Sequence, residues 1–413
     1  MANKSKILHI LILFILVIAT LNNFYDLLSD NYPPKMNDFK PLYVAIRVFL
    51  KGGNPYEDKT IKKEWQIIKE EEKLVDNREP GLPSYPFVHP PATLIILSPF
   101  GITNWQIAKH IYFLFSLIIT ICSLILIAKM GYILDSRKEL WLLILSFFSF
   151  KACILGLLFG QFFYYSFFFC IMAVNFEIKQ KSFLSGIFMA LGLLKPTIGF
   201  PFILYLLVKK RYDIFIYSIL IFIVLNLAVI VILPPSIYDS YIDITNQSLT
   251  PGGNNDYSLQ NKRFFDLTSI HTFIFFITKS RTAVSIISIV LSLFILIHIL
   301  LKRDIYLKDS AYALIILVLL SLLFIYHRIY DSLILSTIFI WLKPSELIDK
   351  LKWKVIFLLP VLLPITGLIL KLRPYIPEIV FYIMVLNIPI SLAAFFIIMI
   401  LLPYQGQDRL EIQ

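Results

Sequence analysis

The stretch DIFIYSILIFIVLNLAVIVIL, residues 213–233, decides the fold class, because after Asp213 it carries no charged side chain. A helix needs about 20 apolar residues to cross the hydrocarbon core of a bilayer. The whole chain agrees, since 58% of its 413 residues are hydrophobic and only 16% are charged. Its mean hydropathy is +0.78, a composition that excludes an ordinary soluble globular protein and predicts an integral membrane protein.

The sequence favours helices over a β-barrel as the spanning elements. It lacks the alternating apolar and polar segments of about 10 residues that are typical of barrel strands. We therefore predict an all-α, polytopic transmembrane helical bundle of about ten spans, forming a single membrane domain over residues 1–413. The apolar runs are 7–28, 104–128, 139–157, 161–178, 213–233, 282–301, 309–326, 329–343, 353–371 and 378–402.

Further apolar segments are too short or too broken to span a bilayer. One covers residues 92–102, and two others, 183–194 and 197–208, are separated by the dipeptide Lys195-Pro196. We expect them to form half-helices or re-entrant segments, which are tolerated where protein or a water-filled cavity covers their backbone.

Basic residues indicate the orientation of the chain. They recur in alternate short loops, which we assign to the cytoplasmic side of the cell membrane together with both termini. The first run, 7–28, has no small-residue cleavage site and is expected to be an uncleaved span. These loops also account for most of the net charge of +11, so no nucleic-acid partner is expected. The loop residues are Lys4, Lys6, Arg137, Lys138, Lys179, Lys181, Lys209 to Arg211, Lys302, Arg303 and Lys350 to Lys354.

Two longer polar segments, 29–91 and 234–265, then lie on the extracytoplasmic side. Within the first, residues 38–56 have an amphipathic pattern that predicts a helix along the membrane surface. Residues 58–76 show a second helical pattern, and this helix lies on the membrane, on the bundle or in solvent.

Polar residues from six separate segments are expected to meet at the outer membrane boundary. An ionisable group this close to hydrocarbon is by default a functional candidate. The set comprises Asp38, His89, Gln161, Lys195, His271 and the stretch YHRIYD at residues 326–331.

Each of these residues also has a structural alternative. Asp38 is well placed to cap the following helix, and Lys195 can extend its ammonium to the headgroups. His89 and Gln161 can simply shape turns, and His271 can be a packing residue. The stretch 326–331 can be an internal ion pair with an interfacial anchor.

Several segments resemble the C-type membrane glycosyltransferases, most closely glycosyltransferase family 87. Their order and spacing carry the resemblance, since no single segment is specific. They are DFKPLYVAIRVFLKGGNPY (38–56), YPFVHPPATLIILSPF (85–100), FGQ (159–161), GIFMALGLLKPTIGFPFIL (186–204) and YHRIYD (326–331).

The resemblance implies an enzyme that moves a sugar, usually mannose, from a polyprenyl phosphate to a lipid or glycan acceptor on the extracytoplasmic face. It also implies a catalytic base in the first outer loop, and the matching residue is Asp38. The lipid-linked sugar is then a co-substrate, and we expect no other cofactor. We expect no metal site, because the sequence has no Asp-x-Asp pair or His-x-x-x-His spacing.

The remaining candidates follow from the chemistry that such a transfer needs. Arg328 is expected to bind two phosphate oxygens through its planar fork, with Lys195 as a second cation. His327 would bind a phosphate oxygen or accept the proton from Asp38. Asp331 would orient Arg328 or His327. Gln161, His89 and Tyr56 are expected to support this site.

Two other classes of function fit the same composition. A carrier or lipid flippase would place polar groups near the membrane midplane in two symmetric halves, and the sequence shows no such repeat. An O-antigen polymerase or ligase would rest on a long outer loop rich in Arg and His, whereas Lys and Glu dominate the long loop of this chain.

Overall fold

A computed structural model describes residues 2–28, 36–74, 87–251, 266–304, 310–346 and 386–401, with short pieces between 253 and 261 and between 375 and 384. These residues form helices and no strand, apart from one isolated antiparallel bridge between Leu267 and Arg328. The all-α fold class is therefore confirmed for the part of the chain that is described.

The described helices are as follows. In the first half of the chain they are α1 (Ala2–Leu28), α2 (Phe39–Leu50), α3 (Asp58–Glu71), α4 (Ala92–Gly101), α5 (Trp105–Met130), α6 (Arg137–Ser149), α7 (Lys151–Phe159), α8 (Phe163–Ile178), α9 (Ser182–Gly192) and α10 (Pro196–Val208). In the second half they are α11 (Tyr212–Ile232), α12 (Ile237–Leu249), α13 (His271–Thr278), α14 (Arg281–Leu301), α16 (Ser310–Phe324), the 3₁₀ helix η2 (Ile329–Thr337), α17 (Ile338–Trp341) and α22 (Asn387–Leu401).

Three of the described helices, α5, α11 and α14, are long and apolar enough to cross a membrane. The pair α6 and α7 makes a fourth span if it is counted as one element, although it bends by 56°. The runs 161–178, 309–326, 329–343 and 378–402 contain shorter apolar helices, the run 7–28 lies within α1, and 353–371 lies outside the described residues. The predicted membrane protein is supported, whereas the predicted number of about ten spans is not confirmed.

The outward surfaces of α11 and α14 are strongly apolar. Val231 of α11 is 83% exposed and Leu301 of α14 is 80% exposed. Few residues on either helix are buried. A helix that is apolar on all sides must be buried in protein or in lipid, so these two helices face the bilayer.

The short apolar segments form the expected half-helices. Residues 92–102 form α4, and the segments on either side of Lys195-Pro196 form α9 and α10. Pro196 is the first residue of α10, where its missing N–H costs no hydrogen bond. The break between the two helices thus places Lys195 at the N-terminus of α10.

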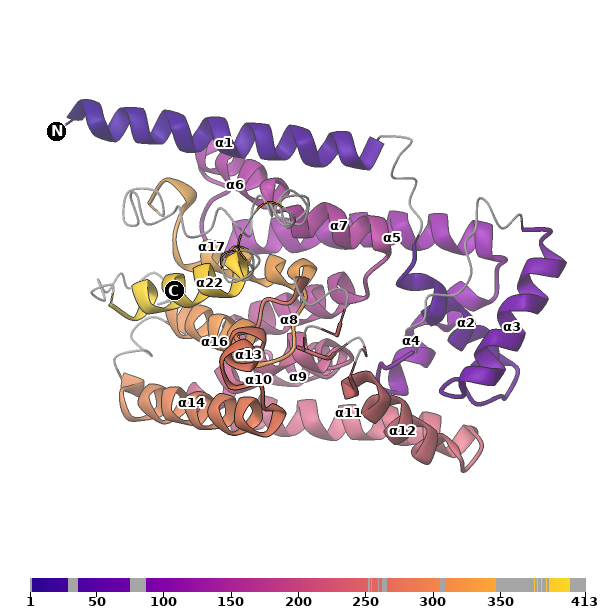
Figure 1. Ribbon diagram of the computed structural model, residues 1–413. Coiled ribbons are helices and arrows are strands. Elements are labelled where there is room, and N and C mark those ends of the chain that lie inside the picture. The colour runs from indigo at the N-terminus through magenta and orange to yellow at the C-terminus, as the bar shows by residue number, and fades with distance from the viewer. Residues whose placement is uncertain are drawn as a thin grey trace.

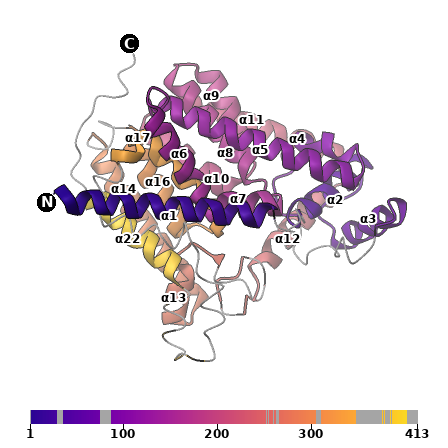
Figure 2. The ribbon, with the colours of Figure 1, turned by 90° about the horizontal axis from the view of Figure 1, so that it is seen from above.

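The helices of the two longer polar segments, 29–91 and 234–265, gather at one end of the molecule (Figures 1 and 2). Figure 1 and Figure 2 both place α2, α3 and α12 there, whereas the N-terminal end of α1 points the opposite way. The two ends of the bundle therefore carry different parts of the sequence.

Helix α3 lies on the protein. Its residues Ile61, Trp65 and Ile68 are buried, and Lys51 of the preceding turn pairs with Glu64 at 2.7 Å. Glu72, just after α3, accepts a hydrogen bond from the backbone N–H of Trp105 at 2.6 Å. These contacts resolve the open question about the second helical pattern in favour of the bundle.

Helix α2 is more enclosed than its amphipathic pattern predicts. Phe39, Tyr43 and Ile46 are buried as expected, but Lys40 on another face is also buried, while Leu50 is 47% exposed. The Lys40 ammonium lies 4.9 Å from the centroid of the Trp65 ring, a cation–π contact. The predicted surface helix is therefore an internal helix packed between α3, α4 and α5.

Candidate active site

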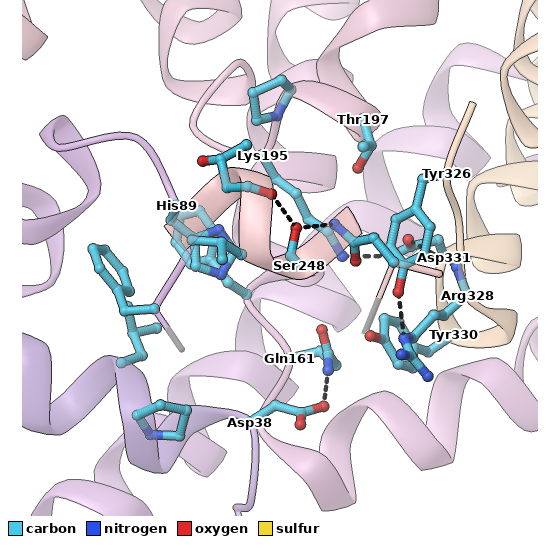
Figure 3. Close-up of a pocket in the computed structure, with 18 of the residues that line it drawn as sticks. Asp38, His89, Gln161, Lys195, Thr197, Ser248, Tyr326, Arg328, Tyr330 and Asp331 are labelled. Atoms are coloured by element: carbon cyan, nitrogen blue, oxygen red, sulfur yellow. Dashed lines mark hydrogen bonds and ion pairs between the residues drawn. The ribbon is translucent and has the colours of Figure 1, made fainter. Parts of the chain in front are cut away.

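A cavity of about 280 Å³ lies where α2 and α12 meet the bundle (Figure 3). Segments far apart in the sequence contribute to it, including the start of α2, the turn before α8, the start of α10, α12 and the turn before η2. Its lining residues are Asp38, Pro41, Leu42, Phe87, Val88, His89, Gln161, Phe162, Lys195, Pro196, Thr197, Tyr241, Thr245, Ser248, Asn255, Tyr326, Arg328, Tyr330 and Asp331.

Asp38 and Gln161 form one side of the cavity. Asp38 is the N-cap residue of α2, yet its side chain makes no capping hydrogen bond to that helix. Its carboxylate instead accepts a hydrogen bond from Nε2 of Gln161, and Figure 3 shows the two side chains pointing toward each other. The capping alternative for Asp38 is therefore wrong, and Gln161 does more than shape a turn.

Gly160 permits this approach. It ends α7 with φ +70°, in the left-handed region that favours glycine. A Cβ atom at this position would lie 2.6 Å from Sδ of Met36 and 2.7 Å from Cβ of Phe39. Without a side chain there, the loop passes close enough for the N–H of Asp38 to donate to the carbonyl of Phe159 at 2.9 Å.

Lys195 lies on another wall of the cavity. Its ammonium donates to Oδ1 of Asp331 at 2.5 Å, and the two side chains are 13% and 3% exposed. It also lies 5.1 Å from the centroid of the Tyr330 ring. Lys195 is thus held inside the protein, which excludes the alternative that it extends to the headgroups.

Asp331 accepts hydrogen bonds from several groups at once. Its Oδ2 lies 3.2 Å from Nδ1 of His327 and 3.4 Å from the backbone N–H of Arg328. His327 is fully buried, and its Nε2 lies 2.9 Å from the hydroxyl of Ser321. His327 is not among the lining residues, so it lies behind the wall and reaches the cavity only through Asp331.

Arg328 enters the cavity from the same turn. It is 5% exposed, and its Nε donates to the hydroxyl of Tyr326 at 2.6 Å. Its Nη1 lies 3.9 Å from Oδ2 of Asp266. Asp331 contacts the backbone of Arg328 but lies closer to His327 and Lys195, so its expected role of orienting His327 fits the geometry better than that of orienting the guanidinium.

One of three comparisons with known proteins identifies a family for this chain. The sequence model of glycosyltransferase family 87 matches residues 87–325, which is more than half of the 413 residues. The chain belongs to glycosyltransferase family 87. Searches of curated proteins and of solved structures found no match.

The matched range of the family 87 enzyme includes His89, Gln161 and Lys195 but neither Asp38 nor Arg328. It ends directly before the stretch YHRIYD. Membership of the family makes the protein a glycosyltransferase and sets aside the carrier or flippase alternative. The apolar helices agree that this transferase is a membrane protein.

In the family 87 enzyme, His89 lines the cavity and Tyr56 supports it from behind. The Tyr56 hydroxyl donates to the carbonyl of His89 at 2.7 Å, so Tyr56 supports the site from behind. The His89 ring lies 5.3 Å from that of Phe162. Burial, followed by the charge of Lys195, lowers the pKa of His89 to about 3. His89 is therefore an uncharged imidazole at neutral pH.

The sixth predicted segment does not join the others. His271 lies outside the lining set, and its ring packs 5.7 Å from that of Tyr257. Burial lowers its pKa to about 4. These contacts agree with the alternative that His271 is a packing residue.

Sequence reasoning missed several lining residues of the family 87 enzyme, notably Thr197, Ser248 and Asn255. Thr197 follows the Lys195-Pro196 break directly, so its place could have been inferred from that dipeptide. Ser248 lies near the end of α12 and Asn255 follows that helix, and nothing in their spacing alone marks them. Among the described residues, no group of three or more His, Cys, Asp and Glu residues is arranged to hold a metal ion.

Proposed function

We propose that this enzyme transfers a hexosyl residue, mannose, from a polyprenyl-phosphate sugar to a hydroxyl group of a lipid or glycan acceptor, with inversion at the anomeric carbon. The observation that carries the proposal is that a carboxylate, Asp38, and a guanidinium, Arg328, line one cavity although they are far apart in the sequence. A base and a phosphate ligand are the two groups that such a transfer needs.

The extracytoplasmic location of the reaction rests on the distribution of charge. The cavity lies at the end of the bundle that carries α2, α3 and α12, opposite the N-terminal end of α1 (Figure 1). The N-terminus carries Lys4 and Lys6, and basic flanks remain on the cytoplasmic side. This relationship supports an active site that faces the outside of the cell membrane.

Asp38 acts as the general base. It takes the proton of the acceptor hydroxyl while the acceptor oxygen bonds to the anomeric carbon from the face opposite the phosphate. The bond between that carbon and the phosphate oxygen breaks, and its electron pair stays on the phosphate. Gln161 holds the carboxylate for this role, since its amide donates to one carboxylate oxygen. A positioned base contributes about 10²-fold to 10⁴-fold to the rate.

The phosphate gains negative charge as it leaves. Fixed cations therefore stabilise the transition state more than they stabilise the bound donor. Arg328 offers a planar fork for two oxygens. Lys195 uses one N–H for Asp331 and carries two more. The Thr197 hydroxyl oxygen is buried and has no hydrogen-bond partner among the described residues, so this group at the N-terminus of α10 suits a phosphate oxygen too.

The size of the cavity supports a single sugar as the transferred group. At about 280 Å³ it lies just below the range of ligand pockets, about 300–1,000 Å³. One hexose with its phosphate fits such a volume, while the lipid chain stays outside. An oligosaccharide polymerase or ligase would have to hold several sugars at once, so the cavity favours the monosaccharide transferase.

Reconstituted enzyme with labelled polyprenyl-phosphate mannose tests the proposal. Wild-type enzyme is expected to transfer label to endogenous lipid or glycan acceptors and to ignore a nucleotide sugar. Asp38→Asn keeps the size of the side chain and removes the base, so transfer should fall by about 10²-fold to 10⁴-fold. Asp58→Asn, which changes a solvent-exposed carboxylate at the start of α3, is the matched control. Near wild-type transfer by Asp38→Asn would refute the assignment.

A further inference from the structure

Helix α12 carries a polar residue where its own pattern calls for an apolar one. Ile237 and Ile244 are buried, and Tyr241 between them is partly buried. The next position on this helical face, at the i, i+4, i+7, i+11 spacing, is Ser248. Ser248 is only 5% exposed, and it lines the cavity.

The same helix contacts the segment that follows α2. Nδ2 of Asn54 donates to the hydroxyl of Ser240 at 2.9 Å. The ring of Tyr56 packs edge-on against that of Tyr241, with centroids 5.0 Å apart. Helix α12 therefore forms one wall of the cavity, and its contacts with Asn54 and Tyr56 hold it in place.

Ser248 in turn holds Asn255 on the cavity wall. Nδ2 of Asn255 donates to the Ser248 hydroxyl at 3.1 Å, and the backbone N–H of Asn255 donates to the Ser248 carbonyl at 2.9 Å. The Ser248 hydroxyl donates to the carbonyl of Thr245 at 2.7 Å. These bonds set the direction of the Asn255 amide. Figure 3 shows Ser248 between the Lys195 and Gln161 regions of the cavity.

We infer that Asn255 recognises a hydroxyl group of the transferred hexose, and that Ser248 positions it for this contact. The inference rests on the proposed function and adds to it a residue that determines which sugar is accepted. The Asn255 amide oxygen is an acceptor for a sugar hydroxyl, and the bond from its Nδ2 to the Ser248 hydroxyl orients the amide.

The proposed function already assigns roles to the other charged and amide groups of the cavity wall. Asp38 and Gln161 serve the acceptor hydroxyl, and the region of Lys195 and Arg328 serves the phosphate. The anomeric carbon must lie between these two groups, so the hydroxyls of the donor sugar ring face what remains, which includes α12 and Asn255. A neutral, oriented amide also discriminates between sugars better than an apolar wall, because a sugar without the matching hydroxyl leaves the amide unpaired.

Competition between donors tests this inference in the reconstituted full-length enzyme. The probes are polyprenyl-phosphate mannose, its glucose epimer and polyprenyl phosphate without a sugar. Asn255→Ala should lower kcat/KM for the preferred donor about tenfold and narrow the preference between the two epimers. Inhibition by polyprenyl phosphate alone should be unchanged, because the phosphate ligands remain.

Ser248→Ala tests the positioning role separately. It should narrow the preference between epimers in the same direction as Asn255→Ala, and adding it to Asn255→Ala should have little further effect, because both act on one contact. Asn246→Ala is the matched control, since this exposed asparagine lies on the same helix but outside the cavity. The control should keep the wild-type preference.

Each outcome decides the inference. An Asn255→Ala enzyme with the wild-type epimer preference overturns it, and so does equal weakening of polyprenyl phosphate binding. A change confined to the KM of the acceptor assigns Asn255 to the acceptor and also overturns it. In these cases wild-type transfer from the lipid donor still stands. If wild-type enzyme transfers no sugar from any polyprenyl phosphate, the proposed function fails first and the inference falls with it.

Discussion

Gln161 donates a hydrogen bond to the carboxylate of Asp38 from a turn 123 residues further along the chain. The bond joins the N-terminus of α2 to the turn between α7 and α8. It gives the FGQ turn a role, since the turn presents an amide to the Asp38 carboxylate. The proposed base is therefore oriented by a residue far along the chain rather than by its own segment.

We expect Gln161→Leu to lower kcat about tenfold to a hundredfold, because a hydrogen bond to a charged group contributes about 1.5–3 kcal/mol. The KM for the lipid donor should change little, since the phosphate ligands remain. Steady-state kinetics of the reconstituted enzyme measure both quantities. Gln66→Leu, at an exposed position on α3, is the control, and equal losses in the two variants would contradict a specific role for Gln161.

Arg328→Ala should slow the chemical step and weaken donor binding together. Arg328→Lys should recover only part of both, because an ammonium keeps the charge but cannot bind two oxygens in one plane. Single-turnover rates and donor titrations separate the two effects. Arg137→Ala, at an exposed residue in α6, should behave as wild type. An unchanged rate in Arg328→Ala would leave the 326–331 turn as a structural anchor.

The turn at Gly160 can be tested against a second glycine with the same backbone conformation. Gly52 has φ +73° and nothing within 4 Å of a built Cβ, whereas a Cβ at Gly160 would collide with Met36 and Phe39. Alanine in the left-handed region costs about 1–2 kcal/mol at either site. We expect Gly52→Ala to lower the melting temperature slightly and keep activity, and Gly160→Ala to lose activity as well. Equal activity in the two variants would show that the close approach is unimportant.

The stability of the enzyme should fall in acid partly through His89. Its pKa is lowered from 6.5 to about 3 in the folded protein, so above pH 6.5 the imidazole is neutral whether the chain is folded or not. As the pH falls from 6.5 toward 3, the unfolded chain binds a proton that the folded chain does not, and stability is lost. His271 acts in the same direction, with a pKa of about 4.

Melting temperatures measured between pH 7 and pH 4 check this prediction. His89→Gln should be less stable than wild type at pH 7 if the ring packing matters, but its melting temperature should decline less steeply with acid. A His89→Gln curve parallel to that of wild type would contradict the lowered pKa of His89.

Much of the fold follows from local sequence. The apolar runs predict the helices, because the bilayer demands length and hydrophobicity that a single segment shows by itself. The break at Lys195-Pro196 was predictable for a similar reason, since proline prefers the first turn of a helix. The joining of Asp38, His89, Gln161, Lys195 and Arg328 was also predictable, because each follows or interrupts an apolar run near the same boundary.

The wrong predictions concern the tertiary contacts that a segment makes. Nothing in the α2 pattern reveals that Lys40 lies between two tryptophans, and so a buried helix was predicted to lie on the surface. His327 was expected to bind a phosphate oxygen or accept the proton from Asp38, yet it lies behind the cavity wall and its ring contacts Ser321 and Asp331. Such outcomes depend on tertiary contacts that a single sequence does not contain. The number of spans stays a prediction.

The constraint at Gly160 has an evolutionary consequence. A relative with another residue in place of this glycine would retain every charged group of the cavity. Its Asp38 carboxylate would nevertheless be displaced. On the proposed mechanism, judging relatives of this enzyme by their acids and bases alone would count inactive proteins as active ones. A glycine at this helix end is then as informative about activity as the proposed base itself.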